Sequence, residues 1–150
     1  MAQIAVVGSG TEWAPAAEEV GRLLAERGCV VVCGGLGEVM EAAARGAKQA
    51  GGTTVGIVPG ESVREANAWI DYAVATGTGH ARNLAVVASC EATIAVGGRW
   101  GTLAEIGFAR VLGRPVVVLE HGWAVEGEGV ERAATPAEAV EVALRLAGVE

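Results

Sequence analysis

The sequence is poor in basic residues, and this limits the partners that it fits. Eleven Lys and Arg residues stand against eighteen Asp and Glu residues in a chain of 150, which gives a net charge of −7. Proteins bind the phosphate backbone of nucleic acids through surfaces rich in Lys and Arg. The composition therefore argues against a nucleic-acid partner.

Long apolar runs and an even set of cysteines are also missing. Hydrophobic residues make up 51% of the chain, but glycines and charges interrupt every apolar run before it reaches membrane-spanning length. No charged, cleavable signal segment precedes the first strand pattern. Cys29, Cys33 and Cys90 lie in or beside apolar runs, as free buried thiols do in a reducing compartment. We therefore expect a cytoplasmic protein without a membrane segment.

The motifs of several common enzyme classes are absent. The first glycine turn, GSGTEW (8–13), has Trp13 where the dinucleotide fingerprint needs its third glycine. Neither a G-x-x-x-x-G-K-[ST] loop nor a G-x-S-x-G elbow occurs. His80 and His121 are isolated from other ligand-type residues, so no metal site is predicted. These absences argue against ordinary NAD binding and against P-loop, serine-hydrolase and zinc chemistry.

Strand-like and helix-like segments alternate along the whole chain. This alternation predicts an α/β fold, with one domain over residues 1–150 that holds a doubly wound, mostly parallel sheet with helices on both faces. Loops are expected at 61–70, with a short capped turn as the alternative there, and at 121–131. The expected strands are 4–7, 29–33, 53–58, 72–75, 92–96, 115–119 and 132–134, and the expected helices are 13–27, 39–50, 80–89, 102–112 and 135–146.

Glycine-rich turns follow several of these strands. In a parallel sheet such turns share the carboxyl edge, where open α/β proteins bind their ligands. The turn after 92–96 leads into a helix start, which presents backbone N–H groups and a positive dipole end to an anion, usually a phosphate. We predict that residues of these turns bind a ligand phosphate. They are Gly8, Ser9, Gly10, Gly34, Gly35, Gly37, Gly97, Gly98, Arg99, Trp100, Gly101 and Thr102.

Two charged residues near these turns have competing interpretations. Thr102 and Glu105 have the spacing of a capping box, so Glu105 is either a helix cap or a functional carboxylate. Arg82 stands near a helix start, where a cation opposes the helix dipole, and this favours a role at a ligand over a solvated side chain. Trp100 has three interpretations: a loop residue, a cover for a ligand ring, or part of a subunit interface.

Three ordered segments resemble one superfamily: GGLGEVMEA (34–42), TGTGHARN (76–83) and GGRWGTLAE (97–105). They are similar to the Rossmann-like superfamily that contains the LOG cytokinin-activating phosphoribohydrolases, the molybdenum cofactor carrier proteins and the DNA-processing protein DprA. The nearest resemblance is to small bacterial proteins similar to molybdenum cofactor carriers. It covers about residues 4–119. Some superfamily members have been mislabelled as lysine decarboxylases, and we do not expect that activity.

The resemblance implies roles for two residues and also shows departures. LOG enzymes use a P-G-G-x-G-T-x-x-E motif and an M-H-x-R-K helix, which by position makes Glu105 the catalytic carboxylate and Arg82 the arginine at the ribose. In this chain Gly97 replaces the Pro, Arg99 replaces the second Gly, and Asn83 replaces the Lys. The carrier proteins resemble the enzymes in fold and bind a phosphate-bearing pterin without turning it over.

Two functions follow as hypotheses. The first is a binding protein for a phosphate-bearing small molecule, a nucleotide or a molybdopterin-type cofactor, at the carboxyl edge of the sheet. The alternative is a LOG-type nucleoside 5′-monophosphate phosphoribohydrolase that cleaves the N-glycosidic bond with Glu105 and Arg82. Neither function requires a further cofactor. The apolar excess predicts a homo-oligomer, either a dimer or a tetramer.

Overall fold

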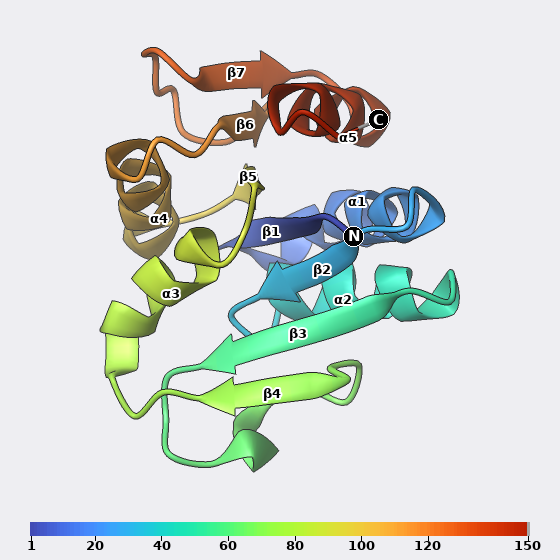
Figure 1. The fold of residues 1–150 in the computed structure, drawn as a ribbon, viewed down its shortest axis with the longest axis vertical. Coiled ribbons are helices and arrows are strands. Elements are labelled where there is room, and N and C mark those ends of the chain that lie inside the picture. The colour runs from blue at the N-terminus through green and yellow to red at the C-terminus, as the bar shows by residue number, and fades with distance from the viewer. Residues whose placement is uncertain (150) are drawn as a thin grey trace.

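A seven-stranded parallel sheet forms the centre of the molecule (Figure 1). The computed structural model describes residues 1–149. The strand order is β4-β3-β2-β1-β5-β6-β7, and every neighbouring pair is parallel. The predicted α/β class and doubly wound sheet are confirmed. The strands are β1 (Gln3–Ser9), β2 (Val30–Cys33), β3 (Thr53–Val58), β4 (Tyr72–Ala75), β5 (Ala92–Gly97), β6 (Val116–Leu119) and β7 (Val130–Ala133).

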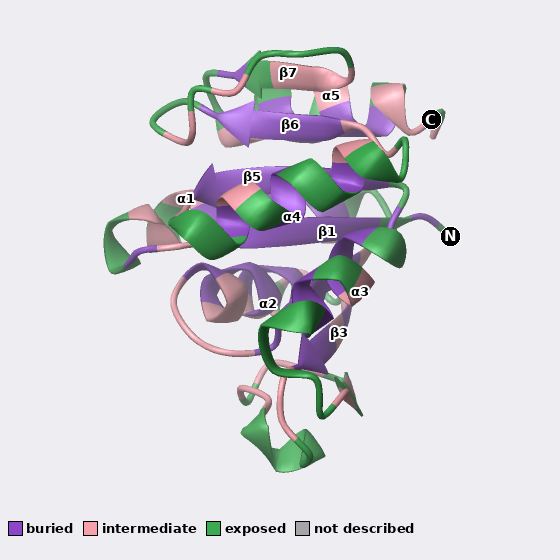
Figure 2. Cartoon of the chain, turned by 90° about the vertical axis from the view of Figure 1, so that its left-hand side faces the viewer, coloured by how far each residue is buried: buried purple, intermediate pink, exposed green. Residues whose placement is uncertain are grey.

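Helices cover both faces of the sheet. One face packs against the first, second and fifth helices, and the other against the third and fourth (Figures 1 and 2). In β1, Ile4 and Val6 join the first core, whereas Ala5 and Val7 join the second. This burial of both faces explains the continuous apolar runs of the central strands. The helices are α1 (Ala14–Glu26), α2 (Val39–Gln49), α3 (Arg82–Ala88), α4 (Trp100–Val111) and α5 (Pro136–Leu146).

The strand order reverses beside β1. The chain runs outward from β1 to β4, and then returns to place β5 along the other side of β1. Ser9 and Gly97 are register partners at the carboxyl ends of these two strands. The segments after β1 and β5 lead to helices on opposite faces, which leaves a crevice at the point where open α/β sheets bind ligands.

Several element boundaries differ from the predicted ones. β1 continues to Ser9, beyond the predicted end at residue 7, because Gly8 and Ser9 pair with β5. β7 covers 130–133, so part of the predicted loop 121–131 is strand. The 61–70 segment contains a 3-10 turn (Val63–Glu65), which is the alternative that the sequence left open there. No helix within residues 1–149 combines the length and the apolar character that a bilayer-crossing segment needs.

Candidate ligand-binding site

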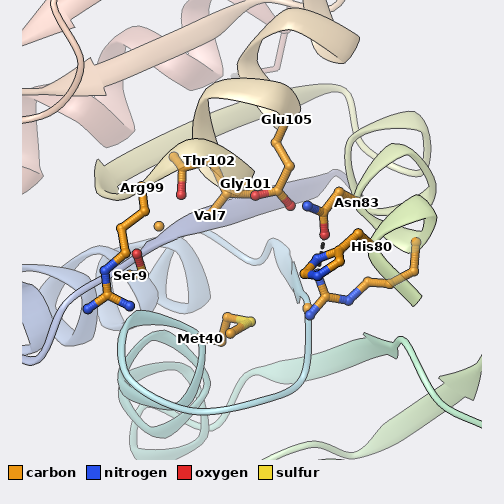
Figure 3. A pocket seen from close by; sticks show the side chains of 12 residues that line it. Val7, Ser9, Met40, His80, Asn83, Arg99, Gly101, Thr102 and Glu105 are labelled. Carbon is orange, nitrogen blue, oxygen red and sulfur yellow. Dashed lines mark hydrogen bonds between the residues drawn. The ribbon is translucent and has the colours of Figure 1, made fainter.

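A cavity of about 250 Å³ opens at the crevice between β1 and β5 (Figure 3). Its wall is built by the end of β1, the loop after β2, the segment leading into α3, and the first turns of α4. These segments are far apart in the sequence and meet because of the strand order. The lining residues are Val7, Gly8, Ser9, Gly34, Met40, His80, Arg82, Asn83, Arg99, Gly101, Thr102 and Glu105.

The start of α4 forms one side of the cavity. The helix begins at Trp100 with Arg99 as its N-cap, so Thr102 and Glu105 already lie inside it. The capping-box interpretation is therefore wrong: the Glu105 carboxyl group lies one turn too far along the helix to reach back to the first N–H groups. The N–H groups of the first turn of a helix have no partner within the helix, so they remain available at the cavity wall.

Glu105 projects from α4 into the cavity (Figure 3). Its side chain is buried, with 7% of the residue exposed. Burial raises the pKa of this carboxyl group to about 8, although the positive charge of Arg82 opposes the rise. The group is therefore mostly protonated at neutral pH and carries little negative charge there.

Arg82 lies at the start of α3, in the same cavity wall. It is 9% exposed, and its Nε atom has no hydrogen-bond partner within the described chain. Its guanidinium donates a hydrogen bond to the Asn83 side-chain oxygen. Burial lowers the pKa of Arg82, and the nearby Glu105 opposes this effect. Arginine nevertheless stays charged in proteins, so the cavity wall holds a buried cation that forms no ion pair with residues 1–149.

Gly34 makes room for this arginine. A Cβ atom on Gly34 would lie 2.9 Å from the Arg82 guanidinium carbon and 2.6 Å from the Met40 sulfur. The Gly34 loop is held from outside by Asn67, whose backbone N–H donates to the Gly35 carbonyl at 2.8 Å and whose side chain donates to the Leu36 carbonyl at 2.7 Å. The 61–70 segment therefore holds the loop after β2 in place. No sequence pattern predicts this contact.

The end of β1 supplies a second polar atom without a partner. The Ser9 hydroxyl oxygen is buried and forms no hydrogen bond within residues 1–149. The next residue, Gly10, donates its backbone N–H to a Glu38 carboxylate oxygen at 2.6 Å. The same oxygen lies 3.9 Å from an Arg99 guanidinium nitrogen. Glu38 therefore brings a carboxylate to the rim of the crevice.

Aromatic rings stand beside the β5–α4 turn. Trp13 stacks on His121, with ring centroids 5.4 Å apart, and a Cβ on Gly97 would lie 2.1 Å from the Trp13 ring. Trp123 donates its ring N–H to the Arg99 carbonyl at 2.9 Å and lies 4.9 Å from Trp100, centroid to centroid. The positive φ of Gly97, 60°, and the Trp13 ring together require glycine at this turn.

The structure gathers some of the predicted site residues at the cavity and leaves others outside it. Glu105 and Arg82 line it, as do Gly8, Ser9, Gly34, Arg99, Gly101 and Thr102. The remaining predicted residues shape the neighbouring turns without lining it: Gly10, Gly35, Gly37, Gly97, Gly98 and Trp100.

The sequence did not point to five residues at this site. Val7, Met40, His80 and Asn83 line the cavity, and Glu38 stands at its rim. Two of them carried a signal, because His80 keeps the His of the LOG M-H-x-R-K motif and Asn83 departs from its Lys. Cys33 is fully buried, and burial raises the pKa of its thiol to about 11, which leaves it protonated and a poor nucleophile. Within the described residues, no cluster of His, Cys, Asp and Glu side chains is suited to hold a metal ion.

The model of the SLOG cluster4 family matches residues 1–144. The chain belongs to this family. A relative from Archaeoglobus fulgidus, itself uncharacterised, is 45% identical over 141 residues, or 92% of this chain and 91% of that protein. The SLOG cluster4 chain also matches solved structures. The molybdenum cofactor binding protein of Rippkaea orientalis has 31% identity and a TM-score of 0.86 over 94% of each chain.

Two further structures extend the comparison of this SLOG cluster4 chain. The molybdenum cofactor carrier protein of Chlamydomonas reinhardtii has 31% identity and a TM-score of 0.86 over 98% of each chain. DNA processing protein A of Streptococcus pneumoniae has 21% identity and a TM-score of 0.73, over 94% of this chain and 61% of that one. The last likeness concerns the fold alone. The superfamily resemblance inferred from the three sequence segments is confirmed.

Proposed function

We propose that this chain binds a phosphate-bearing small molecule, either a molybdopterin-type cofactor or a nucleotide, in the cavity between β1 and β5. One observation carries the proposal: Arg82 is a buried cation whose neighbouring carboxyl group, Glu105, is mostly protonated at neutral pH. A buried charge is costly unless it is paired. An anionic ligand would supply the missing partner.

The polar groups at the other side of the cavity suit the phosphate itself. The first N–H groups of α4 and the Thr102 hydroxyl are donors, and the helix dipole favours an anion there. The Ser9 hydroxyl lacks a partner and lines the same cavity. These groups support a phosphate at the start of α4, in the same cavity that Arg82 lines.

The size of the cavity supports a ligand that is only partly enclosed. Pockets that enclose a whole drug-sized ligand measure roughly 300–1,000 Å³. This cavity, at about 250 Å³, holds a phosphate and the group next to it. The ring of a nucleotide or pterin would then reach the rim, where the exposed Trp100 offers a stacking surface. The likeness to molybdenum cofactor carriers favours the pterin.

The phosphoribohydrolase is the second candidate, because Glu105 and Arg82 line one cavity as that chemistry needs. A carboxylate must be ionised to stabilise an oxocarbenium-like centre or to activate water. With a pKa of about 8, Glu105 is mostly neutral at pH 7 in the free protein. This protonation state favours binding over turnover.

Equilibrium dialysis combined with product analysis separates the two functions. The protein is incubated with molybdopterin, with AMP and with an N6-substituted AMP, and free base and ribose 5-phosphate are sought by chromatography. We expect one ligand per chain and no released base. Arg82→Gln is expected to weaken binding by about tenfold or more, since hydrogen bonds to charged groups contribute about 1.5–3 kcal/mol. The exposed Arg64→Gln is the matched control.

Two outcomes would overturn the binding proposal. One is release of base from a nucleotide that Glu105→Ala abolishes, which would establish the phosphoribohydrolase. The other is the absence of binding of all three ligands by the wild-type protein.

A further inference from the structure

The carboxylate of Glu38 lies at the glycine turn after β1, where dinucleotide-binding proteins of similar fold bind their ligand. In doubly wound dinucleotide-binding sheets, the glycine turn after the first strand and the following helix start bind a pyrophosphate. Here the corresponding N–H, that of Gly10, donates to a Glu38 carboxylate oxygen at 2.6 Å. Gly10 precedes the 3-10 turn (Thr11–Trp13) that leads into α1. The chain's own carboxylate therefore takes the place of an anion at this turn.

The backbone at Glu38 is unusual for a residue with a side chain. Its φ is 59° and its ψ is −123°, a combination that favours glycine. Such conformations persist where the surroundings hold them, often at functional sites. They deliver the side chain from the start of α2 back across the loop to β1.

Glu38 is linked to the cavity through Arg99. The Glu38 oxygen that accepts from Gly10 lies 3.9 Å from an Arg99 nitrogen. Arg99 is the N-cap of α4 and lines the cavity, and Figure 3 shows its side chain extending toward Ser9. A phosphate at the start of α4 and the Glu38 carboxylate would thus share one cation. A second phosphate would have to displace Glu38 or lie against its charge.

We propose that Glu38 restricts the site to ligands with a single phosphate, by occupying the anion position at Gly10 and repelling a second phosphate. This inference rests on the proposed function, because it assumes that the cavity takes a phosphate-bearing ligand. Specificity of this kind comes from a built-in repulsive group as well as from attractive contacts. Monophosphates such as AMP fit this restriction, whereas nucleoside diphosphates and dinucleotides do not.

Binding of AMP, ADP and inorganic pyrophosphate by Glu38 variants tests the restriction. Glu38→Gly removes the carboxylate and suits the backbone conformation, and Glu38→Gln removes only the charge. Glu41→Gln, one turn further along α2, is the control for the loss of one negative charge. Isothermal titration gives the affinities, and thermal unfolding checks that each variant is folded.

We expect the wild type and Glu41→Gln to bind AMP about tenfold or more tightly than ADP, the scale of a single like-charge repulsion in a partly buried site. Glu38→Gly should bring ADP to within about twofold of AMP and should bind pyrophosphate, since the Gly10 N–H is then free. Glu38→Gln should fall between these, because its amide oxygen still accepts from Gly10.

The outcomes separate this inference from the proposed function. If the wild type binds AMP and Glu38→Gly keeps the same preference over ADP, or loses AMP affinity, the restriction is wrong and the proposed function stands. If the wild type binds neither AMP nor molybdopterin but Glu38→Gly binds pyrophosphate, the proposed function fails and the role of Glu38 stands. If no form binds any of these compounds, both are wrong.

Discussion

At the residue scale, Glu105 links the stability of the fold to pH. Burial raises its pKa from 4.5 in the free side chain to about 8 in the folded protein. Between these values the folded chain keeps a proton that the unfolded chain releases. The associated stabilisation is complete below pH 4.5 and is lost as the pH rises through 8.

Glu105→Gln should remove this pH dependence, because the amide has the size of the protonated acid and does not ionise. The difference in free energy of unfolding, variant minus wild type, should therefore increase by on the order of 2–4 kcal/mol from acidic to alkaline pH. Urea unfolding at about pH 5, 7 and 9 measures the difference. Glu41→Gln should run parallel to the wild type. A constant gap between Glu105→Gln and the wild type at all three pH values would contradict the raised pKa.

Substitution of Gly34 tests whether Arg82 takes part in ligand binding. The Cβ of Gly34→Ala would contact the ends of two flexible side chains, Arg82 and Met40, so the fold can adapt while the guanidinium moves. We predict a loss of AMP or molybdopterin affinity of about tenfold with a change in stability below about 1.5 kcal/mol. Gly127→Ala, at an exposed position outside the helices and strands with open space around it, is the control. Unchanged affinity in Gly34→Ala would show that Arg82 does not bind the ligand.

At the scale of elements, glycines set how closely α1 and α2 pack. A Cβ on Gly46 would lie 2.0 Å from the Glu18 carbonyl oxygen, and one on Gly21 would lie 2.0 Å from the Ala43 carbonyl oxygen. Both neighbours are backbone atoms of the facing helix, which cannot rotate away. The two helices therefore touch through their backbones on one face of the sheet.

Gly46→Ala should destabilise the protein by about 1–3 kcal/mol, because the strain of the added methyl group exceeds the gain in helix propensity. Gly107→Ala makes the same chemical change in a helix with nothing within 4 Å, and should stabilise by up to about 1 kcal/mol. Chemical denaturation of both variants gives the two free energies. Equal signs for the two substitutions would refute the close packing of α1 on α2.

Helices and strands that are determined by neighbouring residues can be predicted from the sequence, whereas features that depend on distant residues cannot. Buried strands and amphipathic helices follow from runs of neighbouring residues, so their order was predicted. The start of α4 was not, because Thr102 and Glu105 fit a capping box that the actual helix start at Trp100 overrides. Glu38 escaped notice because its partner, Gly10, is 28 residues away and no sequence pattern connects them.

At the scale of the whole molecule, the topology explains why the site was partly predictable. Parallel order brings the glycine turns after β1, β2 and β5 to one edge, so the place of the site followed from the fold class. The protonation state of Glu105 could not be predicted from the fold class, because it depends on how deeply α4 and α3 bury the carboxyl group. Burial of this kind is a property of the assembled chain.

The outer face of α4 carries the last prediction, that the protein is a homo-oligomer. Ala104, Phe108 and Val111 have helical spacing and are exposed, and Val111 is 84% exposed. Leu84 lies on α3, which packs against α4, and is 41% exposed. Figure 2 shows both helices on one open side of the molecule. An apolar stripe normally faces a core or a partner. A second copy of this chain is the partner that we predict.

Val111→Glu should break this association, because it places a charge on the exposed end of the stripe. Size-exclusion chromatography with light scattering should show a dimer or tetramer for the wild type and the 15.1 kDa monomer for the variant. Ala137→Glu adds the same charge at an exposed position on α5, which covers the opposite face of the sheet, and should leave the mass unchanged. A monomeric wild type would disprove the oligomer, and an unchanged mass for Val111→Glu would move the interface away from α4.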